Sequence, residues 1–418
     1  SLPFIPKYFL LLLRVFFVFY ITIMGKGGEQ AQAANAKTKT MVGEGSDGAV
    51  SSFKLAHMET AELRKWGKSF GITSQDREEL LRELNPFADG IMDPRRINNL
   101  PLEPPKFTYT QLVEAIPKHC FQRSLVTSMR YVLQDLAIIA CFFYLIHQFW
   151  NMQSSVPLAV KCVVWPVYWF CQGAMMTGIW VMAHECGHQA FSDSELTNNI
   201  VGTILHSALL VPYHNWRITH GRHHAKTGSV EDDEVFAPST RASWAGQAMK
   251  KSPLLHAIGI FIMLTIGWIP GYLVFNMTGP AKYKDKNANH FSPTAVFFKP
   301  EEYWLVVQSN AAFFTALACL FYSIYLFGFV RVAAYYIIPY MVVNYHLVLI
   351  TFLQHTDVYM PHFRKPEWNW LRGACCTVDR SFGPMLNAVL HHINDLHVCH
   401  HIFHRVPFYR SEERRVGK

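Results

Sequence analysis

Residues 157–188 read PLAVKCVVWPVYWFCQGAMMTGIWVMAHECGH, an apolar stretch that ends in the two histidines His184 and His188. The preceding apolar stretch, residues 131–150, reads YVLQDLAIIACFFYLIHQFW. Each of the two is long enough to cross about 30 Å of hydrocarbon. The short connection between them, NMQSSV, contains no Lys or Arg. The two stretches are therefore predicted to form a pair of transmembrane helices.

Basic residues lie at the outer ends of this predicted pair instead. They precede the first helix and follow the second, at Lys118, Arg123, Arg130, Arg217, Arg222 and Lys226. Because short loops rich in Lys and Arg stay in the cytosol, both outer ends are predicted to be cytosolic. The net charge of +8 agrees with a place beside an anionic leaflet. The basic residues are dispersed and carry no recognition motif, so no nucleic-acid partner is expected.

Histidines gather in three short clusters that hold eight of the 21 in the chain. The clusters are HECGH, HGRHH and HVCHH, with His184, His188, His220, His223, His224, His397, His400 and His401. Residues i, i+3 and i+4 share one face of a helix, so each HxxHH is expected to direct three ring nitrogens at one point. Three such segments, if they converge, can hold two metal ions.

Three further apolar stretches, residues 254–275, 303–330 and 332–353, separate the second cluster from the third. If the clusters share one site, the number of membrane crossings among them must be even. Residues 254–275, interrupted by Gly and Pro, and the short stretch 200–213 are expected to lie in the membrane interface. The other two are predicted to form a hairpin that turns near residues 328–331.

The predicted fold class is therefore an all-α membrane protein. It has about four transmembrane helices, interfacial helices and a cytosolic histidine-rich cap that holds two metals. Six crossings with a different parity are the alternative.

The predicted organisation has four parts. Residues 1–23 are an apolar N-terminal stretch that is interpreted as non-native, because the sequence MGKGG from Met24 resembles the start of a protein. Residues 24–105 are predicted to be a cytosolic disordered or linker region with one short helix at residues 74–84. Residues 106–410 form the membrane domain, and residues 411–418 are an atypical tail.

Nine cysteines are scattered through the chain without a CxxC pair, so a disulfide framework is not expected. Cys186 and Cys399 lie inside histidine clusters. They are interpreted as small packing residues, with thiolate ligation of a metal as the alternative.

The number of ligands indicates which metal chemistry to expect, because imidazole binds both iron and zinc. A zinc site uses three or four protein ligands, whereas eight or nine histidines suit two metals that stay open to an oxygen species. Two irons that activate dioxygen can remove hydrogen from an unactivated methylene, which no side chain can do. The position beside a bilayer indicates a lipid substrate.

Two other classes of protein compete with this interpretation. HECGH also matches HExxH, in which two histidines bind zinc and Glu185 is the general base of a metallopeptidase. Such an enzyme leaves the other two clusters without a role, and one zinc per chain instead of two irons would identify it. A metal transporter would place its ligands inside the spans near the midplane, whereas these clusters flank the span ends.

Further motifs occur between residues 106 and 409 besides the three clusters. They are AIPKHCFQRS (115–124), AHECGHQAFSD (183–193), RHHAKTGSVEDDEVF (222–236), FLQHT (352–356) and EWNWLRGACCTVDRSFG (367–383). With these motifs the chain resembles the membrane acyl-lipid fatty acid desaturases of the endoplasmic reticulum, specifically the oleate Δ12 (omega-6) type.

The resemblance implies a multi-pass protein of the endoplasmic reticulum membrane with a cytosolic active site. It implies two Fe ions, O2 as co-substrate, and electrons from cytochrome b5 and NADH-cytochrome b5 reductase as separate proteins. The substrate would be a phospholipid-bound acyl chain, with oleoyl converted to linoleoyl by a cis double bond at C12. Alternatives within the family are a C12 hydroxylase and an omega-3 desaturase.

The resemblance also implies roles for histidines outside the clusters. His355 in FLQHT matches a further ligand, and His391 matches a position that is either a ligand or a partner of one. The predicted metal ligands are His184, His188, His220, His223, His224, His355, His397, His400 and His401.

Other side chains are candidates for supporting roles. Possible carboxylate partners of the ligands are Glu185, Asp193, Asp233 and Asp395. Aromatic residues that can line an acyl tunnel are Tyr213, Trp216 and Phe403. The chain departs from the family pattern at Gln189, Gly221 and Cys399, and His404 and Arg405 stand where the family has a small polar pair.

Overall fold

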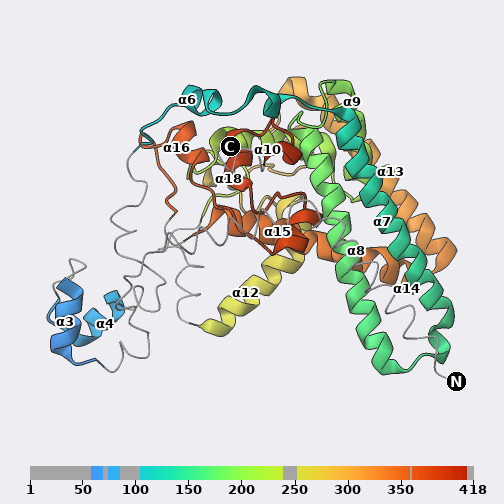
Figure 1. Ribbon diagram of the computed structural model, residues 1–418, viewed down its shortest axis with the longest axis horizontal. Coiled ribbons are helices and arrows are strands. Elements are labelled where there is room, and N and C mark those ends of the chain that lie inside the picture. Colours follow the sequence, from blue (N-terminus) through green and yellow to red (C-terminus); the bar gives the residue numbers. More distant parts are fainter. Residues whose placement is uncertain (1–57, 69–73, 85–103, 239–251, 358–359, 412–418) are drawn as a thin grey trace. The chain divides into compact units, whose positions relative to one another are not determined.

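The computed structural model describes residues 58–68, 74–84, 104–238, 252–357 and 360–411 (Figure 1). The predicted stretch 1–23, most of 24–105 and the tail from residue 412 lie outside these residues. The chain divides into two units, which are considered separately. The described residues are helical and contain no strand, apart from an isolated bridge between Ser229 and Phe363. The predicted all-α class is confirmed.

The smaller unit contains two short helices, α3 (Thr60–Lys68) and α4 (Arg77–Leu84). Leu63, Leu80 and Leu84 are fully buried between them. Asp76 precedes α4, and its carboxylate accepts a hydrogen bond from the Glu79 backbone N–H at 2.8 Å, which satisfies one free donor of the first turn. Helix α4 lies inside the stretch 74–84 that the sequence predicts to be helical, whereas α3 was not predicted.

The larger unit consists of helices, with η marking 3-10 and π segments. In chain order they are α6 (Tyr109–Glu114), η2 (Lys118–Phe121), α7 (Leu125–Met152), η3 (Gln153–Ser155), α8 (Leu158–Gly187), α9 (Glu195–Ala208), α10 (Tyr213–Lys226), α12 (Pro253–Ile266), η4 (Gly267–Tyr272), η5 (Ala281–Tyr283), η6 (Pro300–Glu302), α13 (Tyr303–Phe327), α14 (Phe329–Val332), η7 (Ala333–Ile337), α15 (Ile338–His355), α16 (Trp370–Ala374), α17 (Pro384–Val389), α18 (His397–Ile402) and η8 (Phe408–Arg410).

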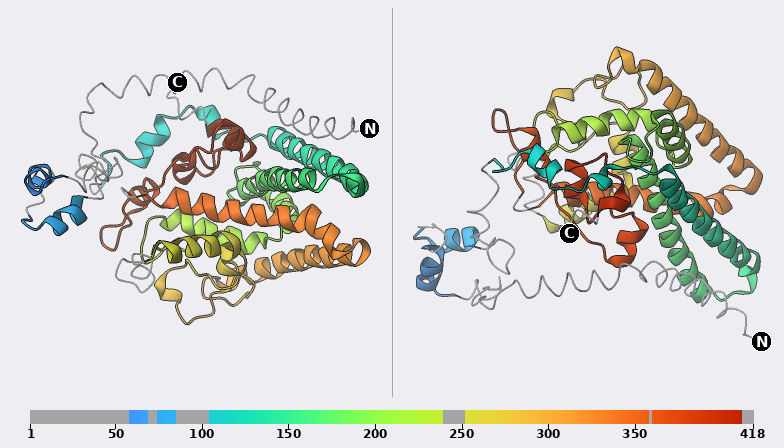
Figure 2. Two further views of the ribbon diagram at one scale, coloured as in Figure 1. Left: turned by 90° about the horizontal axis from the view of Figure 1, so that it is seen from below. Right: turned by 45° about the horizontal axis from the view of Figure 1, so that its top comes forward.

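Helices α7 and α8 form the predicted hairpin and run side by side (Figures 1 and 2). Ser124 caps α7 by accepting from the Thr127 N–H, and Pro157 precedes the first residue of α8. Phe142, Ile146 and Tyr168 are buried in a core between the two helices and the segment around Tyr335. The pair therefore fixes the direction in which α8 delivers His184 and His188.

Helix α8 crosses α15 closely because Gly173 has no side chain at the crossing. A Cβ atom there would lie 2.5 Å from the Val342 Cβ and 2.7 Å from the Pro339 carbonyl oxygen. Small residues at helix crossings let backbones approach in this way. The crossing matters for function because α8 and α15 both end at the histidines.

Helices α13 and α15 make the second predicted hairpin, joined through α14 (Figure 2). The chain turns at Gly328, whose φ of +80° suits a residue without a Cβ. Glu302, at the start of the hairpin, pairs with Arg222 of the second cluster at 2.8 Å, and the hairpin ends at His355. Both ends of the hairpin therefore lie on the side of the histidines.

Four helical stretches are long and apolar enough to cross a membrane, among the described residues. They are Leu125–Ser155, Pro253–Tyr272, Pro300–Phe327 and Phe329–His355. Three of them overlap predicted spans, namely residues 131–150, 303–330 and 332–353. The fourth predicted span, residues 157–183, lies in the 30-residue helix α8, which is not among these four. Its Trp, Tyr, Gln and Gly residues lower its mean hydropathy, and many of them pack inside the protein.

Helix α12 carries the stretch that is predicted to lie in the membrane interface, and this placement stays a prediction. An interfacial helix has a polar face, whereas α12 is apolar on all sides and has no buried residue, with Leu254 and Phe261 strongly exposed. Its regular part has 14 residues, or about 21 Å, and a non-helical residue, Ile269, breaks the following turn. The stretch Pro253–Tyr272 is nevertheless long and apolar enough to cross a membrane.

Helix α9 agrees with the expectation that residues 200–213 follow the membrane surface. Leu196, Ile200 and Ile204, four residues apart, are all exposed on one face. Asn198, Gly202 and His206 are buried on the opposite face. The helix therefore has one apolar face for lipid and one face for the protein.

Candidate metal centre

The predicted histidines converge from four helices. Helix α8 supplies His184 and His188 at its C-terminal end, and α15 supplies His355 as its last residue. Helix α10 carries the second cluster and α18 the third. All nine predicted ligands therefore meet in one region of the larger unit, and their rings contact one another.

A first group contains five imidazoles. Its members are His184, His188, His220, His224 and His400, with one nitrogen from each lying within 4.8 Å of the others. The Nε2 atom of His184 lies 2.9 Å from that of His220 and 3.2 Å from that of His188. Two nitrogens bound to one metal at about 2.1 Å and at right angles would be about 3.0 Å apart. The spacing of the nitrogens therefore suits a shared ion.

A second group contains His223, His355 and His401, which satisfy the same distance criterion. His397 joins this group, since its Nε2 lies 3.0 Å from that of His355. The Nε2 of His223 lies 3.3 Å from the same atom. Four imidazoles thus surround a second position.

The expectation that each HxxHH directs all three rings at one point is wrong. In α10, His220 and His224 belong to the first group and His223 to the second. In α18, His400 belongs to the first group and His401 to the second. Positions i+3 and i+4 point about 100° apart around a helix, so adjacent histidines diverge toward different groups.

Two neighbours determine which ring nitrogen is free in the second group. The Asp233 carboxylate accepts from His223 Nδ1 at 2.7 Å, which leaves Nε2 available. The Thr227 hydroxyl donates to the His223 carbonyl, so its oxygen accepts from His401 Nδ1 at 3.1 Å. His401 Nε2 is then buried without a partner. Such outer contacts fix ring orientation in metal sites.

Burial keeps these histidines neutral, as metal ligands must be. It lowers the pKa of His220, His224, His400 and His401 well below the usual 6.5, with further lowering from neighbouring imidazoles. Burial and His223 lower the pKa of His397 to about 3. The site is therefore a dense set of neutral nitrogen donors.

Aromatic side chains shield the first group. The Trp216 ring stacks on His220 with centroids 4.4 Å apart, and Trp180 lies 5.5 Å from His184. Trp216 therefore packs directly against a predicted ligand. Tyr213 and Phe403 lie in other contacts, against His206 and Phe121 respectively.

The other predicted carboxylate partners differ in position. Glu185 lies 3.5 Å from His184 Nδ1 and accepts from the Phe408 N–H. Asp193 pairs with Arg123 and is mostly exposed, and Asp395 accepts from Asn387. Asp233 hydrogen-bonds His223 of the second group, and Glu185 lies beside His184 of the first.

His391 lies outside both groups. Its Nε2 is 2.6 Å from the buried Asp135 carboxylate of α7. Its ring packs between Tyr131 and Phe408. This pair links α7 to the segment that precedes α18.

His404 beside the first group was not predicted as part of the site. Its ring centroid lies 5.2 Å from that of His188 and 5.4 Å from that of His224. The spacing His397, His400, His401, His404 in the sequence was a signal that could have revealed it.

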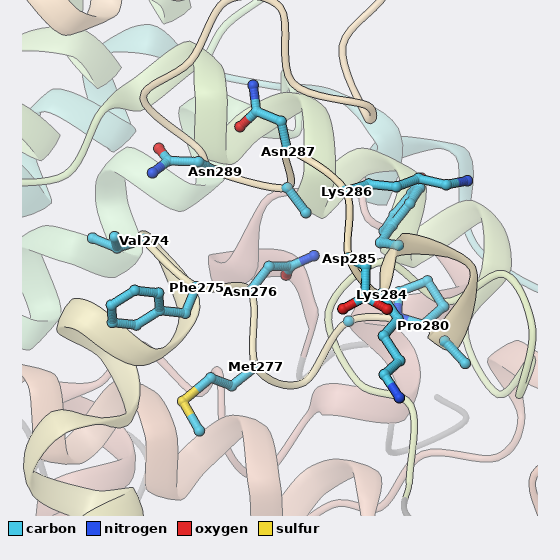
Figure 3. A pocket seen from close by; sticks show the side chains of 14 residues that line it. Val274, Phe275, Asn276, Met277, Pro280, Lys284, Asp285, Lys286, Asn287 and Asn289 are labelled. Atoms are coloured by element: carbon cyan, nitrogen blue, oxygen red, sulfur yellow. The ribbon is translucent and has the colours of Figure 1, made fainter.

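A separate hollow of about 520 Å³ lies between residues 274 and 289 (Figure 3). Asn276, Lys284, Asp285 and Asn287 are among its lining residues. No histidine of either group lines it, so it is not part of this site.

Comparisons with known proteins agree with this geometry. The family model described as "Fatty acid desaturase" matches residues 163–415, and that of a "Domain of unknown function (DUF3474)" matches residues 27–144.

The chain is also similar to named relatives. It is 42% identical to "Omega-6 fatty acid desaturase, endoplasmic reticulum isozyme 1" of Glycine max over 77% of this chain and 82% of the relative. It is 42% identical to "Delta(12)-fatty-acid desaturase" of Arabidopsis thaliana over 75% and 80%. It is 44% identical to "Delta(12) acyl-lipid conjugase (11E,13E-forming)" of Momordica charantia over 75% and 77%. The chain belongs to the fatty acid desaturase family.

Proposed function

We propose that this protein is an oxidoreductase that desaturates a phospholipid-bound acyl chain, converting oleoyl to linoleoyl with two irons and O2. The main support for this proposal is that nine imidazoles from α8, α10, α15 and α18 meet in two groups beside long apolar helices. The position of the new double bond is inferred from relatives, because the similar proteins of Glycine max and Arabidopsis thaliana are named omega-6 and Δ12 desaturases.

The donor set fits two irons. A buried ring nitrogen without a hydrogen-bond partner occurs in each group, at His400 Nε2 in the first and His401 Nε2 in the second. Unpaired buried polar atoms are rare in folded proteins, and a bound metal ion in each group would explain these two. Bound iron supplies the capacity to activate O2 and to remove hydrogen from a methylene group.

The protein's own residues orient the site and keep it dry. Asp233 and Thr227 fix the rings of His223 and His401. Trp216 and Trp180 cover the first group on one side. Exclusion of water protects a reactive centre from side reactions. The proposed reaction removes two hydrogens from adjacent acyl carbons, while O2, two electrons and two further protons complete two waters.

The location and electron donor follow from the same proposal. We place the protein in the endoplasmic reticulum membrane with the histidines on the cytosolic side, because basic residues flank that end of α7 and α8. Cytochrome b5, reduced by NADH-cytochrome b5 reductase, is the proposed donor. Exposed cations such as Lys118 and Arg130 offer a surface of the right sign for an acidic partner.

A zinc metallopeptidase accounts less well for the site. It would use two histidines of HECGH and one further ligand, whereas His184 and His188 lie among three more imidazoles. Glu185, the general base of that interpretation, accepts a hydrogen bond from the Phe408 backbone. The geometry therefore favours the di-iron oxidase.

Expression in a yeast that lacks polyunsaturated lipids tests the proposal. Chromatography of its fatty acids should show linoleate, and iron analysis of the purified protein should give two irons per chain. A hydroxy fatty acid would indicate the C12 hydroxylase, and conversion of supplied linoleate alone would indicate the omega-3 enzyme. The similarity to a conjugase makes this product analysis essential. One zinc and no new fatty acid would refute the proposal.

A further inference from the structure

His404 continues the spacing of the third cluster. It lies seven residues after His397, and His400 and His401 lie between them. His404 follows His400 of the first group by four residues, a spacing that places two side chains on the same face of a helix. Although α18 ends at Ile402, the following turn keeps the His404 ring beside the other imidazoles.

The position of His404 is close to that of a ligand. Ring centroids of neighbouring members of the first group, such as His188 with His224 or His220, lie 4.4–4.9 Å apart. His404 lies 5.2 Å from His188 and 5.4 Å from His224, which is only 0.3–0.5 Å beyond that range. It is nearer to His224 than His223 is, at 5.6 Å. A small side-chain shift would bring it into the group.

The hydrogen bonding of His404 also points to the group. Its Nδ1 is buried and has no hydrogen-bond partner. The same is true of Nε2 on His400, a member of the first group. A polar atom left unpaired in a protein interior calls for a specific explanation, and a shared ion would explain both His404 Nδ1 and His400 Nε2.

We propose that His404 is an auxiliary ligand of the first group, a tenth histidine of the site that holds the metal when another imidazole is displaced. This inference rests on the proposed two-metal function. It concerns a position at which the resembling family has a small polar residue.

Metal retention tests the role without measuring catalysis. The full-length protein, loaded with iron, is exposed to excess chelator, and iron per chain is followed with time. His404→Ser should release one of its two irons about tenfold faster than the unaltered protein, as expected for a residue that supports a metal site. Arg405→Ser, a change of the exposed neighbour, should release both at the unaltered rate. Equal release from His404→Ser and the unaltered protein would overturn the proposal.

A spectroscopic variant separates ligation from a packing role. His404→Cys, loaded with Co²⁺, should show a thiolate-to-cobalt charge-transfer band that His404→Ser lacks. Absence of that band, or faster release of both irons together from His404→Ser, would overturn the ligand role. If the unaltered protein held no metal, the proposed function itself would fail, which is a distinguishable result.

Discussion

Asp233→Asn is expected to weaken the second metal position and spare the first. The Asp233 carboxylate accepts from His223 Nδ1 at 2.7 Å and from the Val235 and Phe236 N–H groups at 3.0 and 3.1 Å. These contacts hold it rigidly against one ligand of the second group. No ligand of the first group depends on it.

The size of the effect follows from the charge that is removed. Hydrogen bonds to a charged group contribute roughly 1.5–3 kcal/mol, against about 1 kcal/mol for neutral partners. Asn keeps the shape of Asp but loses that charge, so about 0.5–2 kcal/mol is lost. Since 1.4 kcal/mol is about a factor of ten, metal affinity at the second position should fall about tenfold.

Chelator titration of the purified protein measures this effect. Iron per chain should fall from two to one at a chelator concentration that leaves the unaltered protein fully loaded. Asp232→Asn is the matched control, because Asp232 makes ion pairs with Lys282 and Lys365, both partly exposed, and touches no ligand. If Asp233→Asn lost both irons together, or neither, the division into two groups would be wrong.

Three other outcomes are expected. Gly173→Ala should lower the unfolding free energy by about 1–3 kcal/mol through the clash with α15, whereas Gly221→Ala, which meets no atom within 4 Å, should not; equal melting temperatures would contradict this. Asp135→Leu leaves a buried nitrogen of His391 unpaired, so stability should fall by about 1–3 kcal/mol while iron analysis still finds two irons; one iron would show that the pair supports a metal directly. In metal-free protein, His397 has a pKa of about 3 when folded and about 6.5 when unfolded. The unfolded chain therefore binds more protons, and thermal stability should decrease as the pH falls from about 6.5 toward 3; a flat melting profile would contradict the burial.

The sequence predicted most of the site because cluster spacing is a local property. His184 and His188 end an apolar run, and HxxHH strings are recognisable without knowledge of the fold. His355 is an isolated histidine at the end of α15. Only the resemblance indicated it, because nothing in its neighbours shows that α15 ends at the second group.

The remaining features depend on contacts between distant segments. The choice of Asp233 over Asp193 and Asp395 follows from the loop after α10, which no periodicity describes. Helix α8 is less apolar than a lipid-exposed span because its neighbours, not lipid, surround much of it. Helix α12 is apolar on every side, so only the break at Ile269 shows where its regular part ends.

The interleaving of the two groups makes them a single unit of assembly. Helix α18 contributes His400 to one and His397 and His401 to the other. A nascent chain that has not yet produced α18 has four imidazoles for the first position and two for the second. Neither position has all of its ligands until α18 has been synthesised. We therefore expect metal to bind both positions late, after the last of these helices has been synthesised.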